Sequence, residues 1–228
     1  MNAALARAPW ARVSRGTRSR IAVIAWCLAA LAFAAAARAR HFPHAADRVL
    51  LDACGPLVLP LLSYALAGAV VGGRSFSSAV APLKAFGASP ARAAVAALAV
   101  AIACCASLGA LLGAAADVIS QGTAVHSLAL RDGAASAYAC ALGGAAYAAW
   151  FVLGATFGRR GGGRLAFLLA DWVLGANVTA AALVTPRGHL RNILGGAPPM
   201  ELSERGSAIA LVAIALLCSA IATWRVRR

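Results

Sequence analysis

The sequence predicts an all-α polytopic membrane protein with six transmembrane helices, and three observations support this fold class. Hydrophobic residues make up 62% of the 228 residues, charged residues make up 12%, and the mean hydropathy is +0.79. A soluble domain is roughly half apolar and about a quarter charged. The apolar residues form long runs without the apolar–polar alternation of membrane β-barrel strands. Because backbone groups exposed to lipid must be hydrogen-bonded within their own segment, we expect these runs to be helices.

Six apolar runs approach or exceed the length that a helix needs to cross a hydrocarbon core of about 30 Å. They cover residues 21–37, 49–71, 91–115, 134–157, 165–184 and 207–224. The predicted membrane domain is therefore 21–224, between a basic N-terminal segment (1–20) and a short basic tail (225–228). The first run is also compatible with a signal peptide, because basic residues precede it and the small-residue string AFAAAARAR ends it. Cleavage there would leave five spans.

Basic residues are distributed unevenly between the two sides of this predicted topology. One side carries fourteen basic residues and no acidic residue, in 1–20, 74–92, 159–164 and 225–228. The other side carries seven basic residues together with six acidic ones. This asymmetry predicts that the first side, with both termini, is cytoplasmic. We expect the protein to be a multi-pass protein of the cell (inner) membrane. The net charge of +14 is then a topology signal. We expect no nucleic-acid partner, since that needs a basic face on a folded domain.

Two features inside the runs predict helix packing or function. Asp171 is the one ionisable residue enclosed by a run, about 10 Å from the cytoplasmic end at 1.5 Å per residue. Such a residue is a functional candidate by default, and the alternative is a structural carboxylate bonded to a Ser, Tyr or Trp of a neighbouring helix. Three G-x-x-x-G pairs predict close packing in a tight bundle, and possible dimer contacts: Gly68 and Gly72, Gly109 and Gly113, Gly154 and Gly158.

No catalytic or metal site is predicted. All four histidines fall in the predicted outer connections. His41, His44 and Asp47 form an H-x-x-H-x-x-D pattern that brings three potential ligands near one helix face, and the alternative is a plain polar connector. The sequence has no C-x-x-C pair, and five of the six cysteines lie within apolar runs, where Cys acts as a small apolar residue. A small intramembrane enzyme is the weakest of the functional hypotheses.

The loop between the second and third runs has a pattern of its own. Phe76, Val80 and Leu83 recur at the spacing of one helix face, and Pro82 favours a short helix over a long one. Three residues that suit a turn and a new helix start then follow: Gly87, Ser89 and Pro90. We expect a short amphipathic element held against the inner membrane face. It would serve either as an anchor or as a docking site for a cytosolic partner.

Two stretches resemble a known family. PLKAFGASPARAAVAALAV, residues 82–100, resembles the coupling segment of ABC-transporter permeases, where a short cytosolic helix and a Gly-x-Ser-type turn sit in a groove of the ATPase subunit. Its place between the second and third runs resembles permeases of the exporter type (type 2 family). Residues 185–228 are similar to the C-terminal pattern of that family. There, a Pro-x-x-His stretch and a Gly-containing outer turn precede a last span that ends in basic residues.

The resemblance implies a permease subunit of an ABC-type exporter, which couples ATP hydrolysis by a separate ATPase to substrate movement. It implies a coupling segment at 74–90, an outer loop at 185–206 and a second permease subunit, either a copy of this chain or a different one. By resemblance the ATPase would contact Leu83, Lys84, Phe86, Gly87, Ser89 and Pro90. No G-x-x-x-x-G-K-[ST] motif is present, so ATP and Mg would be bound by the partner and no cofactor by this chain.

The sequence departs from the family at GRSFSSAV, residues 73–80, where the family often has acidic residues and a Gly-Thr. This departure leaves open which ATPase would bind. The alternative function is a non-transporting membrane scaffold or assembly factor that anchors a cytosolic partner through the same loop.

Overall fold

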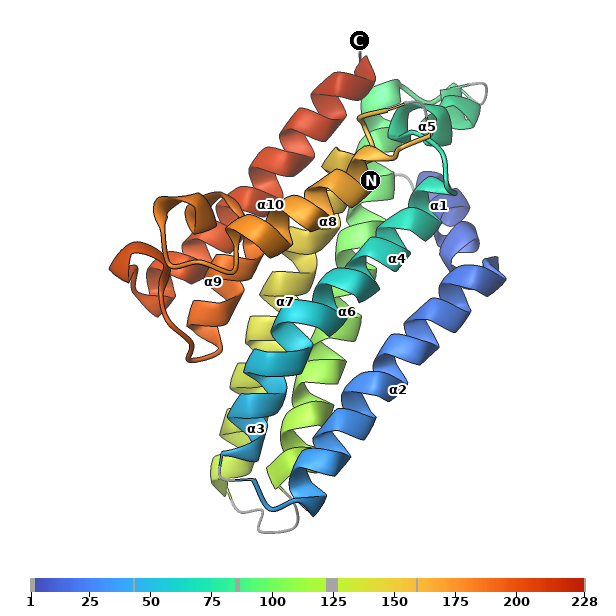
Figure 1. The fold of residues 1–228 in the computed structure, drawn as a ribbon. Helices are drawn as coiled ribbons and strands as arrows, with labels where there is room; N and C mark the ends of the chain where they lie inside the picture. Colours follow the sequence, from blue (N-terminus) through green and yellow to red (C-terminus); the bar gives the residue numbers. More distant parts are fainter. Residues whose placement is uncertain (1–2, 43, 85–86, 122–126, 159, 228) are drawn as a thin grey trace.

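The computed structural model describes residues 3–42, 44–84, 87–121, 127–158 and 160–227, and all of their regular secondary structure is helical (Figure 1). Two long helices, α6 (Pro90–Gln121) and α7 (Ser127–Gly154), lie antiparallel at the centre of a bundle. The helices α2 (Thr17–Ala39) and α4 (Leu59–Val71) pack against this pair, and so does α10 (Glu204–Arg227). The all-α prediction is confirmed.

The N-terminal part of the chain begins with α1 (Ala3–Arg15), which packs against α4 and α6. The predicted basic segment 1–20 is therefore part of the bundle. After α2, the short α3 (Ala45–Arg48) continues through η1 (Val49–Val58) into α4 as one 27-residue helix. η1 has the wide turns of a π-helix, and Pro56 and Pro60 in this region have no N–H for the regular α-helical hydrogen bonds.

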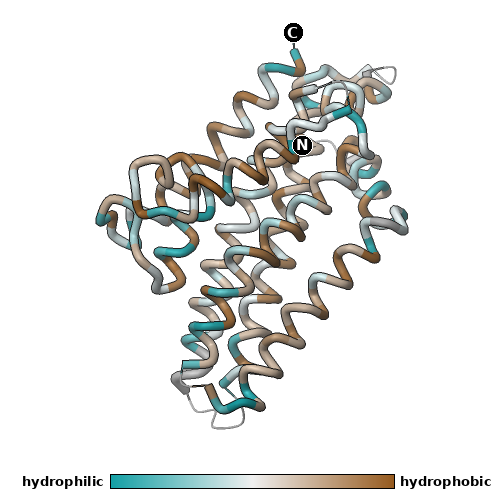
Figure 2. The backbone as a smooth tube through the Cα atoms, in the orientation of Figure 1, coloured by the Kyte–Doolittle hydropathy of each residue, from teal (hydrophilic) through white to brown (hydrophobic). Residues whose placement is uncertain are grey.

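In the described part of the chain, five helices are long and apolar enough to cross a membrane. They are Ser19–Ala39, Ala45–Val71, Pro90–Gln121, Arg131–Gly154 and Glu204–Arg227, and they match the first four and the last of the predicted spans. Figure 2 shows apolar residues along these helices, and many large apolar side chains point outward, among them Ile24, Leu28, Leu111, Ile209 and Leu216. Such a surface is compatible with a lipid environment. These features support a multi-pass membrane protein.

The fifth predicted span, 165–184, is not a single helix. α8 (Gly163–Leu174) has 12 residues, about 18 Å at 1.5 Å per residue, which is too short for a full crossing. The chain then turns through η2 (Ala180–Val184), α9 (Pro186–Ile193) and η3 (Pro199–Glu201) before α10 begins. The apolar residues of η2 extend the hydropathy signal, but Gly, Asn and Thr between α8 and η2 are poor helix formers. We call residues 175–203 the folded-back segment (Figure 1).

Several basic segments meet at one end of the bundle, which we call the basic end. α5 (Phe76–Lys84) lies there, and its Phe76 N–H donates to the Ala155 carbonyl just after α7, at 3.0 Å. Near the end of α10, the Arg225 guanidinium lies 4.1 Å from the centre of the Phe157 ring. Arg12 of α1 is hydrogen-bonded to both α4 and α5. Both ends of the described chain therefore lie at the basic end.

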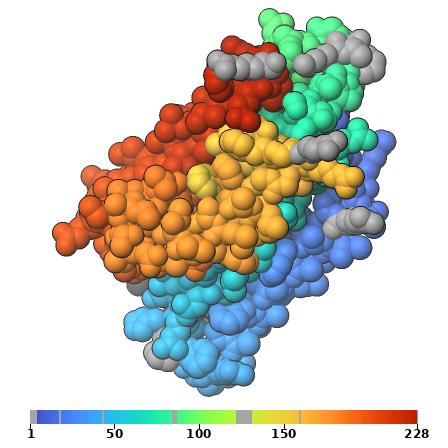
Figure 3. Space-filling model, turned by 45° about the horizontal axis from the view of Figure 1, so that its top comes forward, coloured from blue at the N-terminus to red at the C-terminus, as the bar shows by residue number. Residues whose placement is uncertain are grey.

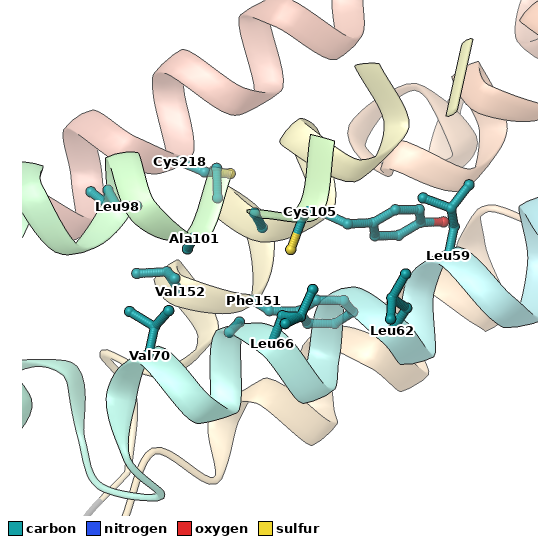
Figure 4. Packing of buried hydrophobic residues seen from close by; sticks show 14 of the residues in the cluster. Leu59, Leu62, Leu66, Val70, Leu98, Ala101, Cys105, Phe151, Val152 and Cys218 are labelled. Atoms are coloured by element: carbon teal, nitrogen blue, oxygen red, sulfur yellow. The ribbon is translucent and has the colours of Figure 1, made fainter. Parts of the chain in front are cut away.

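The core lies between α4, α6, α7 and α10 (Figure 4). α4 contributes large aliphatic side chains, α7 contributes the aromatic ones, and α6 contributes mainly small residues. Buried members of this cluster include Leu59, Leu62, Leu66, Val70, Leu98, Ala101, Cys105, Tyr147, Phe151, Val152 and Cys218. Small residues on α6 allow close approach of the helices, which stabilises a bundle in lipid through van der Waals contact.

Candidate functional site

The first candidate site is segment 74–90, which contains α5. The side chains of Phe76, Val80 and Leu83 are buried against the bundle, as their helical spacing predicts. The opposite face, with Ala81 and Pro82, is exposed. The loop therefore contains a short amphipathic helix. Because Leu83 is buried within this chain, it holds α5 in place, and a partner would contact the exposed face instead.

Hydrogen bonds fix α5 to its neighbours. One guanidinium nitrogen of Arg12 donates to the carbonyl of Val70 at the end of α4, at 3.1 Å, and another donates to the carbonyl of Ala79 in α5, at 2.9 Å. Burial, followed by the charge of Arg74, lowers the pKa of Arg12. The Phe76 bond to the residue after α7 adds a third connection. α5 is thereby joined to α1, α4 and α7.

Residues 87–89 lead directly into α6. Gly87 has φ +77°, a conformation that glycine adopts without strain. The Ser89 hydroxyl accepts a hydrogen bond from the Arg92 N–H at 3.3 Å, and Pro90 is the first residue of α6. Ser89 is thus an N-cap, and Pro90 occupies the helical position where its missing N–H costs least. Of the remaining predicted contact residues, Phe86 and the side chain of Lys84 lie outside the described part of the chain.

The second candidate site surrounds Asp171, which is fully buried. One carboxylate oxygen accepts a hydrogen bond from the Tyr147 hydroxyl of α7, at 3.0 Å. The other accepts one from the backbone N–H of Arg187 in the first turn of α9, also at 3.0 Å. A carboxylate at a helix N-terminus satisfies a free N–H and interacts favourably with the helix dipole. Asp171 therefore holds α8 against Tyr147 of α7 and against the start of α9.

A wider polar network holds the folded-back segment. His189 is buried, with one ring nitrogen 2.8 Å from the Leu183 carbonyl and the other 3.3 Å from the Ser207 hydroxyl of α10. Asn192 donates to that same hydroxyl at 2.8 Å, and Arg191 donates to three backbone carbonyls of the segment. The sequence predicts only that His189 lies in an outer connection. Its burial could not be predicted, because hydropathy does not separate a buried from an exposed His.

The predicted glycine pairs take three different roles. A Cβ on Gly109 or Gly113 would lie 2.5 Å or 2.6 Å from a backbone carbonyl oxygen of α7, so this pair lies where α6 and α7 are in closest contact. Gly154 lies against α8. Gly72 and Gly158 follow helix ends with positive φ. Gly68, Gly143 and Gly144 also have close neighbours: the Arg164 guanidinium, the Leu190 side chain and the Cys105 carbonyl, respectively.

The histidine pattern in the connection after α2 does not gather three ligands. His44 and Asp47 lie 3.7 Å apart, and both side chains are largely exposed. Within the described ranges, no group of three His, Cys, Asp or Glu residues is placed to hold a metal ion.

Comparisons with protein-family models, with curated proteins and with solved structures gave no match to this chain.

Proposed function

We propose that this chain is the membrane-spanning permease subunit of an ABC-type exporter, and that α5 with the following turn transmits force from a cytosolic ATPase. The observation that carries this proposal is the junction of α5 with α6: the Ala88 N–H donates to the Leu83 carbonyl of α5 at 3.2 Å, and Ser89 caps the start of α6. A partner on the exposed face of α5 would act on a rigid element. The other face of α5 is buried, its Ala79 carbonyl accepts a hydrogen bond from Arg12 of α1, and its Phe76 N–H donates to the Ala155 carbonyl just after α7.

From the turn at Ser89, α6 leads to the centre of the bundle. α6 begins at Pro90 and runs for 32 residues along α7. The two helices approach closely at Gly109, Gly113 and Gly144, where an added Cβ would lie within 2.6 Å of a backbone carbonyl oxygen of the other helix. Packed interfaces of this kind pass a displacement on rather than absorbing it. A push on α5 would therefore move the α6–α7 pair relative to α4 and α10.

In this proposal the chain crosses the inner membrane six times, with both termini in the cytoplasm. α8 and the folded-back segment together form the fifth crossing, because the ends of the described chain lie at the same end of the bundle. The excess of Lys and Arg at that end supports the cytoplasmic assignment. ATP and Mg would be bound by the ATPase, and a second permease subunit, such as a copy of this chain, would complete the transporter.

The test is site-specific crosslinking from the exposed face of α5. A photo-reactive amino acid replaces Ala81 in the full chain, expressed in its native host, and the crosslinked partner is identified by mass spectrometry. We expect a protein with a nucleotide-binding P-loop. The matched control is the same substitution at Ser14, which is exposed on α1 at the same end of the bundle, and it should give no such product.

The outcome also separates the alternative function. A crosslink from position 81 to a protein without a nucleotide-binding motif would support the scaffold role and reject the exporter. The absence of any crosslinked partner from position 81 would leave α5 as a membrane anchor.

A further inference from the structure

A second feature of the basic end lies apart from α5. Figure 1 shows α2 running alongside α4, and a groove of about 1190 Å³ lies between α1, α2 and α4 near this end. In the space-filling view, α2 stands partly separate from the body of the molecule (Figure 3). The groove runs along α4 from Gly72 to Leu61, roughly 16 Å at 1.5 Å per residue. It is far larger than packing defects in a folded core, so it has room for a ligand.

One end of this groove is strongly basic. Its lining includes Arg12, Arg15 and Arg164, and no acidic residue. The Arg164 guanidinium lies over the Tyr64 ring, 5.4 Å from its centre, and Gly68 leaves room for one of its terminal nitrogens. Its Nε donates to the Gly161 carbonyl at 3.2 Å.

No carboxylate neutralises these arginines in the described part of the chain, where the ion pair found is the one between His44 and Asp47. Burial lowers the pKa of Arg164. A guanidinium that is more than half buried without a counter-charge is unfavourable, and an anion beside it would relieve that cost.

The other end of the groove is apolar. Ala22 and Trp26 of α2 face Leu61, Tyr64 and Ala65 of α4. α2 and α4 both belong to candidate membrane spans, so this part of the groove lies at membrane depth. A ligand that fills the whole groove must therefore carry a negative group at one end and a hydrocarbon chain at the other.

We propose that the groove binds an anionic phospholipid, with its phosphate at Arg15 and Arg164 and an acyl chain along Trp26, Leu61 and Ala65. Basic pockets between transmembrane helices are a recognised form of binding site for anionic lipid headgroups. This inference does not depend on whether α5 binds an ATPase. It makes the groove between α1, α2 and α4 a lipid-binding site.

The test is native mass spectrometry of the full chain in mild detergent, titrated with phosphatidylglycerol. We expect one tightly bound lipid per chain, with much weaker binding of phosphatidylcholine of the same acyl composition. Arg15→Gln or Arg164→Gln should each weaken phosphatidylglycerol binding about tenfold, as expected for the loss of one charge-assisted hydrogen bond. Arg160→Gln is the matched control, because Arg160 is exposed near the same end but does not line the groove. It should leave the affinity unchanged.

A steric pair tests the apolar half. Ala65→Trp fills the groove and should abolish binding, whereas Ala25→Trp, on the exposed face of α2, should not. Equal loss with Arg160→Gln would overturn the proposal, because it would show attraction by overall charge. Retained binding in Ala65→Trp, or full competition by inorganic phosphate, would overturn it by showing an anion site without an acyl-chain site. Groove closure by a second copy of the chain would appear as a dimer that binds no lipid, and would equally reject it.

Discussion

At the scale of single residues, Asp171 connects α8 to α7 and to the start of α9. Replacing it with Leu would leave two buried donors, the Tyr147 hydroxyl and the Arg187 N–H, without their acceptor. Each unsatisfied buried donor costs about 1–3 kcal/mol. We therefore expect Asp171→Leu to lower the free energy of unfolding by on the order of 3 kcal/mol, measured as loss of thermal stability in detergent.

Two further variants distinguish a structural from a functional Asp171. Tyr147→Phe removes one bond and should cost about 1 kcal/mol. Asp171→Asn keeps an oxygen for the Arg187 N–H and should preserve most of the stability. If Asp171→Asn folds normally but abolishes the activity of the complex, the carboxylate has a role beyond holding α9. If it unfolds as readily as the Leu variant, the charge itself is structural.

At the scale of elements, the contact between α6 and α7 depends on glycine. A methyl group on Gly113 would lie 2.6 Å from the Ser136 carbonyl oxygen and 2.8 Å from the Cys140 sulfur, whereas one on Gly133 would meet nothing closer than 3.7 Å. In a helix interior, Ala is favoured over Gly by up to about 1 kcal/mol. We expect Gly133→Ala to be neutral or stabilising and Gly113→Ala to destabilise by about 1–3 kcal/mol, the usual cost of overpacking. Equal unfolding temperatures for the two variants would contradict close packing there.

The same elements show what sequence patterns predict well. The apolar runs located five membrane-length helices, and helical spacing identified the buried face of α5. The break after α8 was missed because hydropathy averages over residues and treats Ala180–Val184 as a continuation. The position of α9 after this break depends on a tertiary bond, from the Arg187 N–H to Asp171, that no local pattern contains. Similarly, the G-x-x-x-G spacing does not distinguish Gly109, in a helix contact, from Gly158, in a turn.

At the scale of the whole molecule, the charge pattern groups four segments that are far apart in the sequence. The sequence assigns 1–20, 74–92, 159–164 and 225–228 to one side, and the structure brings their described residues together through bonds such as Arg12 to Ala79. The arrangement of α8, α9 and α10 required the structure. Five full-length spans alone would leave the two ends of the chain on opposite sides of the membrane. The ends share one side only if α8 and the folded-back segment together carry the chain across once more.

This arrangement predicts the accessibility of single positions in intact cells. Ser203→Cys lies just before α10 and Ser77→Cys lies on α5, and both residues are exposed. The native cysteines of the described chain are buried or half-buried, so they should react slowly with a membrane-impermeant thiol reagent. We expect Ser203→Cys to be labelled from outside the inner membrane, and Ser77→Cys only after the membrane is opened. Labelling of both from one side would mean that α8 and the folded-back segment re-enter without crossing. The chain would then have five spans, and the basic ends of α1 and α10 could not both be cytoplasmic.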